Sequence, residues 1–173
     1  VDSLPPDSIV INESLTSSRA LPDLLAYTDR YSFHGNASGG IGWALPASIG
    51  IKLAHPRRPV ICLSGDGSAM YSIQALWTAA NLNLSIVFVI TNNRSYRILK
   101  QRLLGFHQND SYLGMDFNNP NIDFAGLARS LGVTSETITE PNDIRGRIED
   151  AFKQSGPTLL NIIVDGKVNA MKK

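Results

Sequence analysis

Short apolar runs alternate with amphipathic stretches along this chain. The runs PVICLS (59–64) and SIVFVIT (85–91) are apolar and rich in β-branched residues, which is typical of strands buried on both faces of a parallel sheet. Between them, apolar residues recur at three- and four-residue spacing, as on one face of a helix: Ile73, Leu76, Trp77 and Ala80. The segment predicts a strand–helix–strand unit, with Ser72 as the helix cap and Trp77 in the core.

The same alternation continues through the rest of the chain. It predicts strands at 8–12, 133–138 and 158–164, and helices at 17–27, 41–55, 95–103, 124–132 and 143–154. Pro46 is expected near the first turn of its helix or at a bend, Gly132 at a helix C-cap, and Trp43 in the core. This order of elements predicts an α/β fold: a doubly wound, mostly parallel sheet of about six strands with helices on both faces.

Two segments lack this periodicity. Residues 1–8 are linker-like, and residues 104–121 are rich in Gly, Asn, Asp and Pro, which predicts a mobile loop or lid. The chain also begins with Val1 rather than Met. We therefore expect residues 1–173 to form a single domain that belongs to a longer protein.

Composition narrows the class of function. Hydrophobic residues make up 43% of the chain and charged residues 18%, which is typical of a globular protein. The formal net charge of +1 predicts no general attraction to nucleic acid or to a membrane surface. The single cysteine, Cys62, falls inside a predicted strand, which excludes an internal disulfide and fits a reducing, cytoplasmic location.

Polar residues follow both strands of the central unit. Asp66 comes directly after the first strand within a GDG triplet, and Asn93 ends the NN pair after the second strand. Because the carboxyl ends of parallel strands meet at one edge of a sheet, these two side chains are expected to lie close together. Carboxylate and amide oxygens suit Mg²⁺, and the backbone carbonyl of Ser95 would supply a third ligand. The pattern predicts a metal–phosphate site.

The glycines beside Asp66 suit a bound phosphate. Gly65 and Gly67 let the backbone approach an anion without a Cβ atom in the way, and the amides of Gly67 and Ser68 would point toward it at a helix start. Alone, GDG is a turn and NN is an Asx-turn or helix cap, but the pair on neighbouring strand ends is more specific. The segment is neither a Walker A loop nor a GxGxxG fingerprint.

Asn93 follows Asp66 by 27 residues. With this GDG and NN signature, the chain resembles the thiamin diphosphate-dependent 2-oxo acid decarboxylases and synthases. The stretch GDGSAMYSIQALWTAA is closest in motif to the benzoylformate decarboxylase branch, and ASGGIGWALPASIG (37–50) is similar to the segment that holds the cofactor's pyrimidine. The resemblance covers nearly the whole chain and implies the family's carboxy-terminal, diphosphate-binding domain.

The resemblance implies a role for each matching residue. Mg²⁺ would be held by Asp66, Asn93 and the carbonyl of Ser95. The residues expected to bind the cofactor are Thr16, Gly39, Ile41, Gly65, Gly67, Ser68 and Tyr96. Among them, the Gly39 carbonyl would accept a hydrogen bond from the cofactor's 4′-amino group. Ile41 would wedge beneath the cofactor and hold it bent; the alternative is a core residue at a helix start.

The substrate side departs from the benzoylformate branch, which commonly has small residues after NN. Here the sequence continues RSYRIL, and Ile98 and Leu99 are expected to line the substrate pocket. Arg94 and Arg97 would meet a substrate carboxylate or an acyl-carrier phosphate, or else be solvated charges at a helix end. No catalytic residue is assigned in this domain, and His34 is the one candidate to face the cofactor.

The implied activity is decarboxylation of a 2-oxo acid, with release of an aldehyde or transfer of the acyl unit. An acetolactate synthase-like carboligase is the second enzymatic interpretation, and a non-catalytic nucleotide-binding or assembly domain is the alternative of another class. In the family, the glutamate that activates the cofactor belongs to a separate amino-terminal domain of the neighbouring subunit, and no glutamate here matches it. We therefore expect amino-terminal and middle domains as partners, a homodimer or homotetramer, and an inactive isolated chain.

Overall fold

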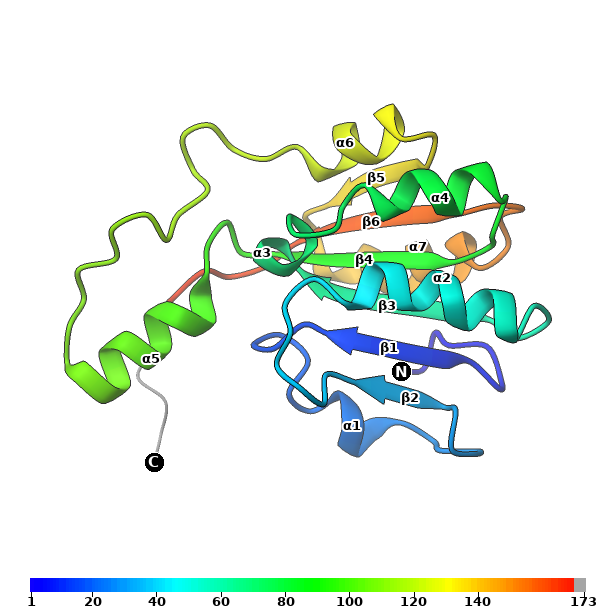
Figure 1. Ribbon diagram of the computed structural model, residues 1–173, viewed down its shortest axis with the longest axis horizontal. Coiled ribbons are helices and arrows are strands. Elements are labelled where there is room, and N and C mark those ends of the chain that lie inside the picture. The colour runs from blue at the N-terminus through cyan, green and yellow to red at the C-terminus, as the bar shows by residue number, and fades with distance from the viewer. Residues whose placement is uncertain (170–173) are drawn as a thin grey trace.

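Six strands form one sheet in the order β2-β1-β3-β4-β6-β5 (Figure 1) in the computed structural model, which describes residues 1–169. Every pair of neighbouring strands is parallel. The strands are β1 (Ile9–Glu13), β2 (Phe33–Gly35), β3 (Val60–Gly65), β4 (Val87–Asn92), β5 (Thr134–Ile138) and β6 (Thr158–Ile163). The predicted α/β class with a parallel sheet is confirmed.

Helices cover both faces of the sheet. They are α1 (Leu21–Leu24), α2 (Ala44–Ala54), α3 (Asp66–Ala69), α4 (Ala75–Asn81), α5 (Arg97–His107), α6 (Phe124–Ser130) and α7 (Ile144–Ala151), with a 3₁₀ turn at Pro141–Asp143. Figure 1 shows α2, α4 and α6 on the near face and α7 behind the sheet. Among residues 1–169, no helix is long and apolar enough to cross a membrane.

Two apolar clusters explain why the central strands are apolar throughout. On β1, Ile9 and Ile11 pack with α2, α4 and α6, whereas Val10 packs on the opposite face with Ala151 of α7. β4 alternates in the same way, with Phe88 on the first face. Because both faces are covered, neither needs polar side chains along these strands.

The chain order creates a crevice at one end of the sheet. β1 and β3 are neighbours, but the chain leaves β1 toward β2 on one side and leaves β3 toward β4 on the other. Such a switch point opens a crevice at the carboxyl ends of the two strands. Figure 1 shows α5 lying beyond this end of the sheet, with a long segment running back from it to α6.

In the first half of the chain, several elements of the structure differ from those predicted. The helix expected at 17–27 is one turn only, α1, because Ser18 donates from its hydroxyl to Asn12 Oδ1 at 2.8 Å and holds the preceding residues in turns. The short edge strand β2 was not predicted. Ser72 is not a helix cap: α4 begins at Ala75, and the Ser72 hydroxyl donates to the Gly42 carbonyl at 2.6 Å.

Two further predictions are wrong in part. Trp43 packs against the core as expected, but the side chain of Trp77 lies on the outer side of α4 and is 57% exposed. The helix predicted at 95–103 continues to His107 and ends at Gln108, which has a positive φ of 49°. The first four residues of the predicted loop at 104–121 are therefore helical, and the mobility of the remainder stays a prediction.

Candidate functional site

A cleft of about 540 Å³ occupies the crevice at the carboxyl end of the sheet. Its walls come from the segments that follow β1, β2, β3 and β4 and from the first turns of α5. All twelve residues predicted for the cofactor, the metal and the substrate pocket line it: Thr16, Gly39, Ile41, Gly65, Asp66, Gly67, Ser68, Asn93, Ser95, Tyr96, Ile98 and Leu99. The structure thus brings together residues that are up to 83 positions apart in the chain.

Asp66 is a buried carboxylate at the end of β3. It is 2% exposed, and its two oxygens accept hydrogen bonds from the amides of Gly67 at 2.9 Å and Ser95 at 3.2 Å. Burial raises the pKa of its carboxyl above the ordinary value of 3.8, although these backbone N–H groups oppose the shift. Within residues 1–169, no basic side chain pairs with Asp66. A carboxylate that is buried without a cation fits a metal ion at this position.

The Asn93 side chain accepts from the same backbone amide as Asp66, that of Ser95. Its Oδ1 accepts hydrogen bonds from the Ser95 amide at 3.1 Å and from the Ser95 hydroxyl at 2.9 Å. The Asx-turn that NN can form is therefore present, and it places the amide oxygen beside the Asp66 carboxylate. An amide oxygen has two lone pairs, and both accept from Ser95 here, so a metal bond at Asn93 Oδ1 requires the rotatable Ser95 hydroxyl to turn away.

The two glycines of the GDG triplet differ in their surroundings. A Cβ atom on Gly67 would lie 2.6 Å from the ring of Tyr96, whereas a Cβ atom on Gly65 would meet nothing within 4 Å. The Gly67 amide already donates to Asp66, and α3 is a single turn with a correspondingly small dipole. Gly67 is thus required here for packing against Tyr96, and its expected contact with phosphate stays a prediction.

The segment before α2 forms a tight turn over the cleft. Asn36 shapes it, since Asn36 Oδ1 accepts from the Gly39 amide at 2.8 Å and its Nδ2 donates to the Gly40 carbonyl at 2.7 Å. Gly39 and Gly42 both have positive φ, 75° and 84°. Ile41, between them, is 47% exposed and lines the cleft. The alternative of a core residue at this position is therefore wrong.

Glu13 has a structural role that was not predicted. This carboxylate is 2% exposed and accepts hydrogen bonds from the amides of Gly42 at 2.5 Å and Ala44 at 2.9 Å. It caps α2, whose own N-cap residue Trp43 makes no side-chain cap. An acid at the end of an apolar strand was the available signal, but its partners lie about thirty residues away in the chain.

Asn92 was missed as well. Its Oδ1 accepts from the Arg94 amide at 3.1 Å, and its Nδ2 donates to Asn161 on β6 at 3.1 Å, which in turn donates to Thr137 on β5 at 3.2 Å. This polar ladder, buried at Asn92 and Asn161, crosses three strands and supports the turn that carries Asn93. The lone asparagine in the apolar run TLLNIIV was the signal in the sequence.

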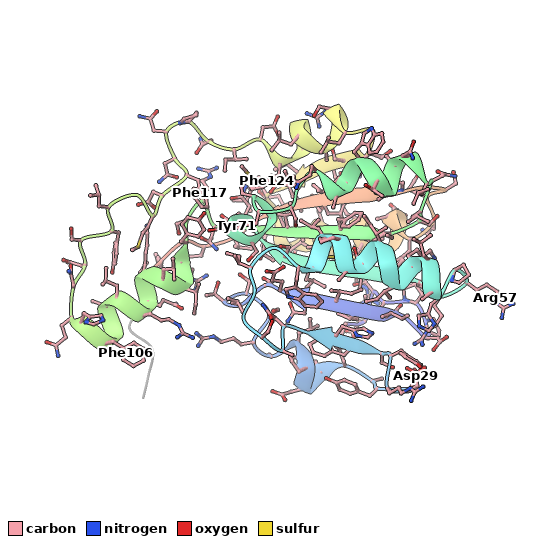
Figure 2. All side chains as sticks on the ribbon, viewed as in Figure 1. Asp29, Arg57, Tyr71, Phe106, Phe117 and Phe124 are labelled. Carbon is pink, nitrogen blue, oxygen red and sulfur yellow. The ribbon has the colours of Figure 1, made fainter. Side chains whose placement is uncertain are left out.

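The base of α5 is anchored to the segment that follows it. The ring of Tyr96 packs edge-on against Phe117 with centroids 4.7 Å apart, and the Tyr96 amide donates to the Met115 carbonyl at 3.0 Å. Lys100, which is 6% exposed, pairs with Asp116. Figure 2 shows Phe117 and Tyr71 near the cleft end of the sheet and Phe106 at the far end of α5.

The three other residues considered for the cofactor or substrate, His34, Arg94 and Arg97, differ in whether they reach the cleft. His34 on β2 does not line the cleft, and its Nε2 atom is buried without a partner among the described residues. Arg94 is exposed and also lies outside the cleft lining. Arg97 does line the cleft, and one of its terminal nitrogens donates to the Asp165 carbonyl at 2.8 Å.

Comparison with known proteins decides the family. The family model described as "Thiamine pyrophosphate enzyme, C-terminal TPP binding domain" matches residues 17–162. The chain belongs to this family. The cofactor is the thiamin diphosphate that the GDG and NN spacing indicated, and Mg²⁺ is the family's usual partner metal.

Relatives of this TPP-binding domain come from both expected branches. One is the "Putative acetolactate synthase large subunit IlvX" of Mycobacterium tuberculosis, 35% identical over 95% of this chain and 33% of that protein. The benzoylformate decarboxylase of Pseudomonas aeruginosa is 34% identical over 94% of this chain and 30% of that protein. The domain therefore spans about a third of the length of these relatives.

A solved structure shows the same fold. The thiamine diphosphate-dependent 4-hydroxybenzoylformate decarboxylase of Rhodococcus jostii RHA1 superimposes on this TPP-binding domain with a TM-score of 0.89 at 34% identity. The match covers 97% of this chain and 31% of that one.

Proposed function

We propose that this domain holds the diphosphate and Mg²⁺ end of thiamin diphosphate in an enzyme that decarboxylates a 2-oxo acid, in the manner of a benzoylformate decarboxylase. The observation that carries the proposal is the convergence of Asp66 and Asn93 oxygens on the Ser95 amide, at 3.2 Å and 3.1 Å, inside the cleft. One of these oxygens belongs to a buried carboxylate that no basic side chain of residues 1–169 neutralises.

The two sides of the cleft hold different parts of the cofactor in the proposed site. Asp66, Asn93 and the Ser95 carbonyl hold the metal, and the diphosphate lies against Thr16 and Ser68 and the backbone of Gly65 and Gly67. On the other side, the Gly39 carbonyl orients the pyrimidine and Ile41 supports the cofactor from below, which its exposure in the cleft permits. The remaining cofactor contact is the ring of Tyr96, which borders the cleft. Thiamin diphosphate, when bound, supplies the nucleophilic carbon for cleavage next to a carbonyl.

The cleft also supports the proposal that this domain carries only half of an active site. Its two acidic lining residues are Glu13 and Asp66, and each accepts two backbone N–H groups. Both carboxylates are therefore held against the backbone of this domain rather than presented to the cofactor's pyrimidine. We therefore include in the proposal a glutamate from a separate amino-terminal domain, a middle domain, and a homodimer or homotetramer that assembles the site.

The setting proposed is the cytoplasm, on the basis of the single cysteine, Cys62. Burial raises the pKa of its thiol, which keeps it a neutral core residue. The formal net charge of +1 supports neither a nucleic acid nor a membrane as a partner.

A second candidate is carboligation, as in an acetolactate synthase. The identities of 35% to the IlvX protein and 34% to the benzoylformate decarboxylase favour neither branch. Product analysis of the full-length enzyme with benzoylformate, phenylpyruvate and pyruvate separates the two. Acetolactate as the dominant product from pyruvate would replace decarboxylation by carboligation.

Cofactor binding tests the proposal against a nucleotide-binding domain. We expect the full-length protein to gain thermal stability with thiamin diphosphate and Mg²⁺, to lose that gain when EDTA is added, and to gain none from ADP and Mg²⁺. Calorimetry on the same samples gives the affinities. Stabilisation by ADP but not by thiamin diphosphate would overturn the proposed function.

A further inference from the structure

Arg102 brings a positive charge to the wall of the cleft that α5 provides. It follows Ile98 by four residues and Leu99 by three, so the three side chains share one face of the helix. All three line the cleft. Along this face, the wall changes from apolar to cationic within about 6 Å, the rise of four helical residues.

This charge has no partner within the described chain. Arg102 forms no hydrogen bond or ion pair with any side chain of residues 1–169. Lys100, two residues earlier, is buried and pairs with Asp116, while Arg97 donates to the Asp165 carbonyl. Of the basic side chains on α5 in the cleft, Arg102 is therefore the one without a structural contact in this part of the molecule.

The acidic groups of the cleft do not balance Arg102. Glu13 and Asp66 are both 2% exposed, and their carboxylate oxygens accept hydrogen bonds from backbone amides. An arginine in a cleft with no carboxylate beside it attracts anions and suits a carboxylate in particular, because its planar guanidinium donates two parallel hydrogen bonds.

We propose that Arg102 selects a 2-oxo acid that carries a second carboxylate at the far end of its chain. The inference rests on the proposed function, which puts thiamin diphosphate, and with it the reacting carbonyl, in the cleft that Arg102 lines. The methylene groups of such a substrate lie along Ile98 and Leu99, and the distal carboxylate pairs with Arg102. Because Ile98 and Arg102 are about 6 Å apart along the helix axis, diacids with two or three methylene groups between the carbonyl and the distal carboxylate are the first candidates.

The test compares matched acids on the full-length, cofactor-loaded enzyme. The pairs are 2-oxoglutarate with 2-oxohexanoate, and 2-oxoadipate with 2-oxoheptanoate, which are similar in length but differ in the distal charge. We expect a higher kcat/KM for each diacid than for its partner. In Arg102→Gln, the ratio of diacid to monoacid kcat/KM should fall about 10- to 100-fold, the effect of losing a charge-assisted hydrogen bond.

Two further variants keep the result specific. Arg102→Lys retains the charge without the bidentate geometry, and should recover part of the diacid preference. Arg57→Gln removes an exposed arginine at the opposite end of the sheet (Figure 2), and should leave the ratio unchanged.

The outcomes separate this inference from the function on which it rests. Calorimetry that finds no binding of thiamin diphosphate and Mg²⁺ to the wild-type enzyme overturns both. If cofactor binding is normal, three results overturn the inference about Arg102 and leave the proposed function standing. The wild type shows no preference for the diacids, neither diacid is turned over, or Arg102→Gln lowers kcat/KM equally for both members of a pair.

Discussion

A carboxylate oxygen of Glu13 lies 2.5 Å from the amide nitrogen of Gly42, 29 residues further along the chain. The second oxygen accepts from the Ala44 amide, so one side chain at the end of β1 fixes both the start of α2 and the turn that presents Ile41. Strand and turn are thereby joined beneath the cleft by two charge-assisted hydrogen bonds.

Replacement of Glu13 by Gln is expected to destabilise the domain by about 2 kcal/mol, because an amide NH₂ then faces one of two backbone N–H groups. Cofactor affinity should fall as well, since the turn at Gly39 and Ile41 loosens. Urea unfolding and calorimetry measure the two effects. Glu140→Gln is the matched control, because Glu140 is an exposed acid, and a similar loss of stability there would contradict the explanation.

Loss of either metal ligand should abolish Mg²⁺-dependent binding of the cofactor. We expect Asp66→Ala and Asn93→Ala to leave the full-length protein folded while removing the oxygen ligands that the ion prefers. Calorimetry with thiamin diphosphate, with and without Mg²⁺, measures the change. Asp110→Ala removes an exposed acid as the control. Wild-type affinity in both site variants would refute the metal site.

The pKa of Asp66 gives the metal-free domain a defined dependence on pH. Burial raises the pKa of this carboxyl in the folded state above the ordinary value of 3.8. Between the two values the folded chain binds more protons than the unfolded chain, so this group lowers the free energy of unfolding as pH rises through that window. Asp66→Asn should remove this contribution, and Asp110→Asn should not. Urea unfolding at a series of pH values tests it, and identical pH profiles for wild type and Asp66→Asn would contradict it.

The same titration acts in the opposite direction on the metal. A protonated Asp66 cannot ligate Mg²⁺, so metal-dependent cofactor affinity should fall as pH falls through the raised pKa of the folded state. Calorimetry between about pH 4 and pH 7 brackets the ordinary carboxyl range and the region above it. An affinity that stays constant down to the ordinary aspartate value would argue against Asp66 as a ligand.

The two glycines of the GDG triplet should respond differently to alanine. Gly67→Ala places a methyl group 2.6 Å from the Tyr96 ring and is expected to destabilise the domain by about 1–3 kcal/mol. Gly65→Ala meets nothing within 4 Å and should leave stability nearly unchanged, yet lower the affinity for the diphosphate. Thermal unfolding and calorimetry on both variants decide the matter, and the reverse pattern would show that the two roles are misassigned.

Lys100 is expected to control the mobility of the segment after α5. Lys100→Met removes its pair with Asp116. Hydrogen exchange at the Tyr96 amide, which donates to Met115, and at the Phe117 amide, which donates to Arg94, should therefore speed up about tenfold. Lys153→Met breaks an exposed pair with Asp150 and serves as the control. Bound cofactor should slow exchange in this segment of the wild type. Exchange there as slow as in the central strands, without cofactor, would contradict the predicted mobility.

The placement of Asp66 and Asn93 could be predicted because it depends on local rules. Each follows a strand whose apolar run is visible in the sequence, and parallel topology brings strand ends to one edge. The contacts of Glu13 could not be predicted, since its partners Gly42 and Ala44 become neighbours only when the crossover from β1 to α2 closes. The prediction that Trp77 lies in the core was wrong for a related reason: helical spacing identifies an apolar face but not what covers it.

Arg102 shows a different limit. A helix predicted to stop at residue 103 leaves Arg102 in its last turn, with no indication that it faces the cleft. The predicted helix at 95–103 already contains Ile98, Leu99 and Arg102, but only the structure shows that the face they share lines the cleft. Helix ends are set by weak local preferences. Here Gln108 ends the helix with a positive φ, and because it is not a glycine the sequence carried no clear stop signal at that position.

The position of α5 beyond the end of the sheet has a practical consequence for engineering. Residues 97–107 are one uninterrupted piece of sequence that belongs to no strand, while the loops proposed to hold the cofactor lie earlier in the chain. Under the role proposed for Arg102, exchanging this piece between homologues should change substrate preference while the loops proposed to hold the cofactor stay the same. Selectivity in such a domain is then modular, and new preferences become reachable through changes on one helix rather than through redesign of the sheet.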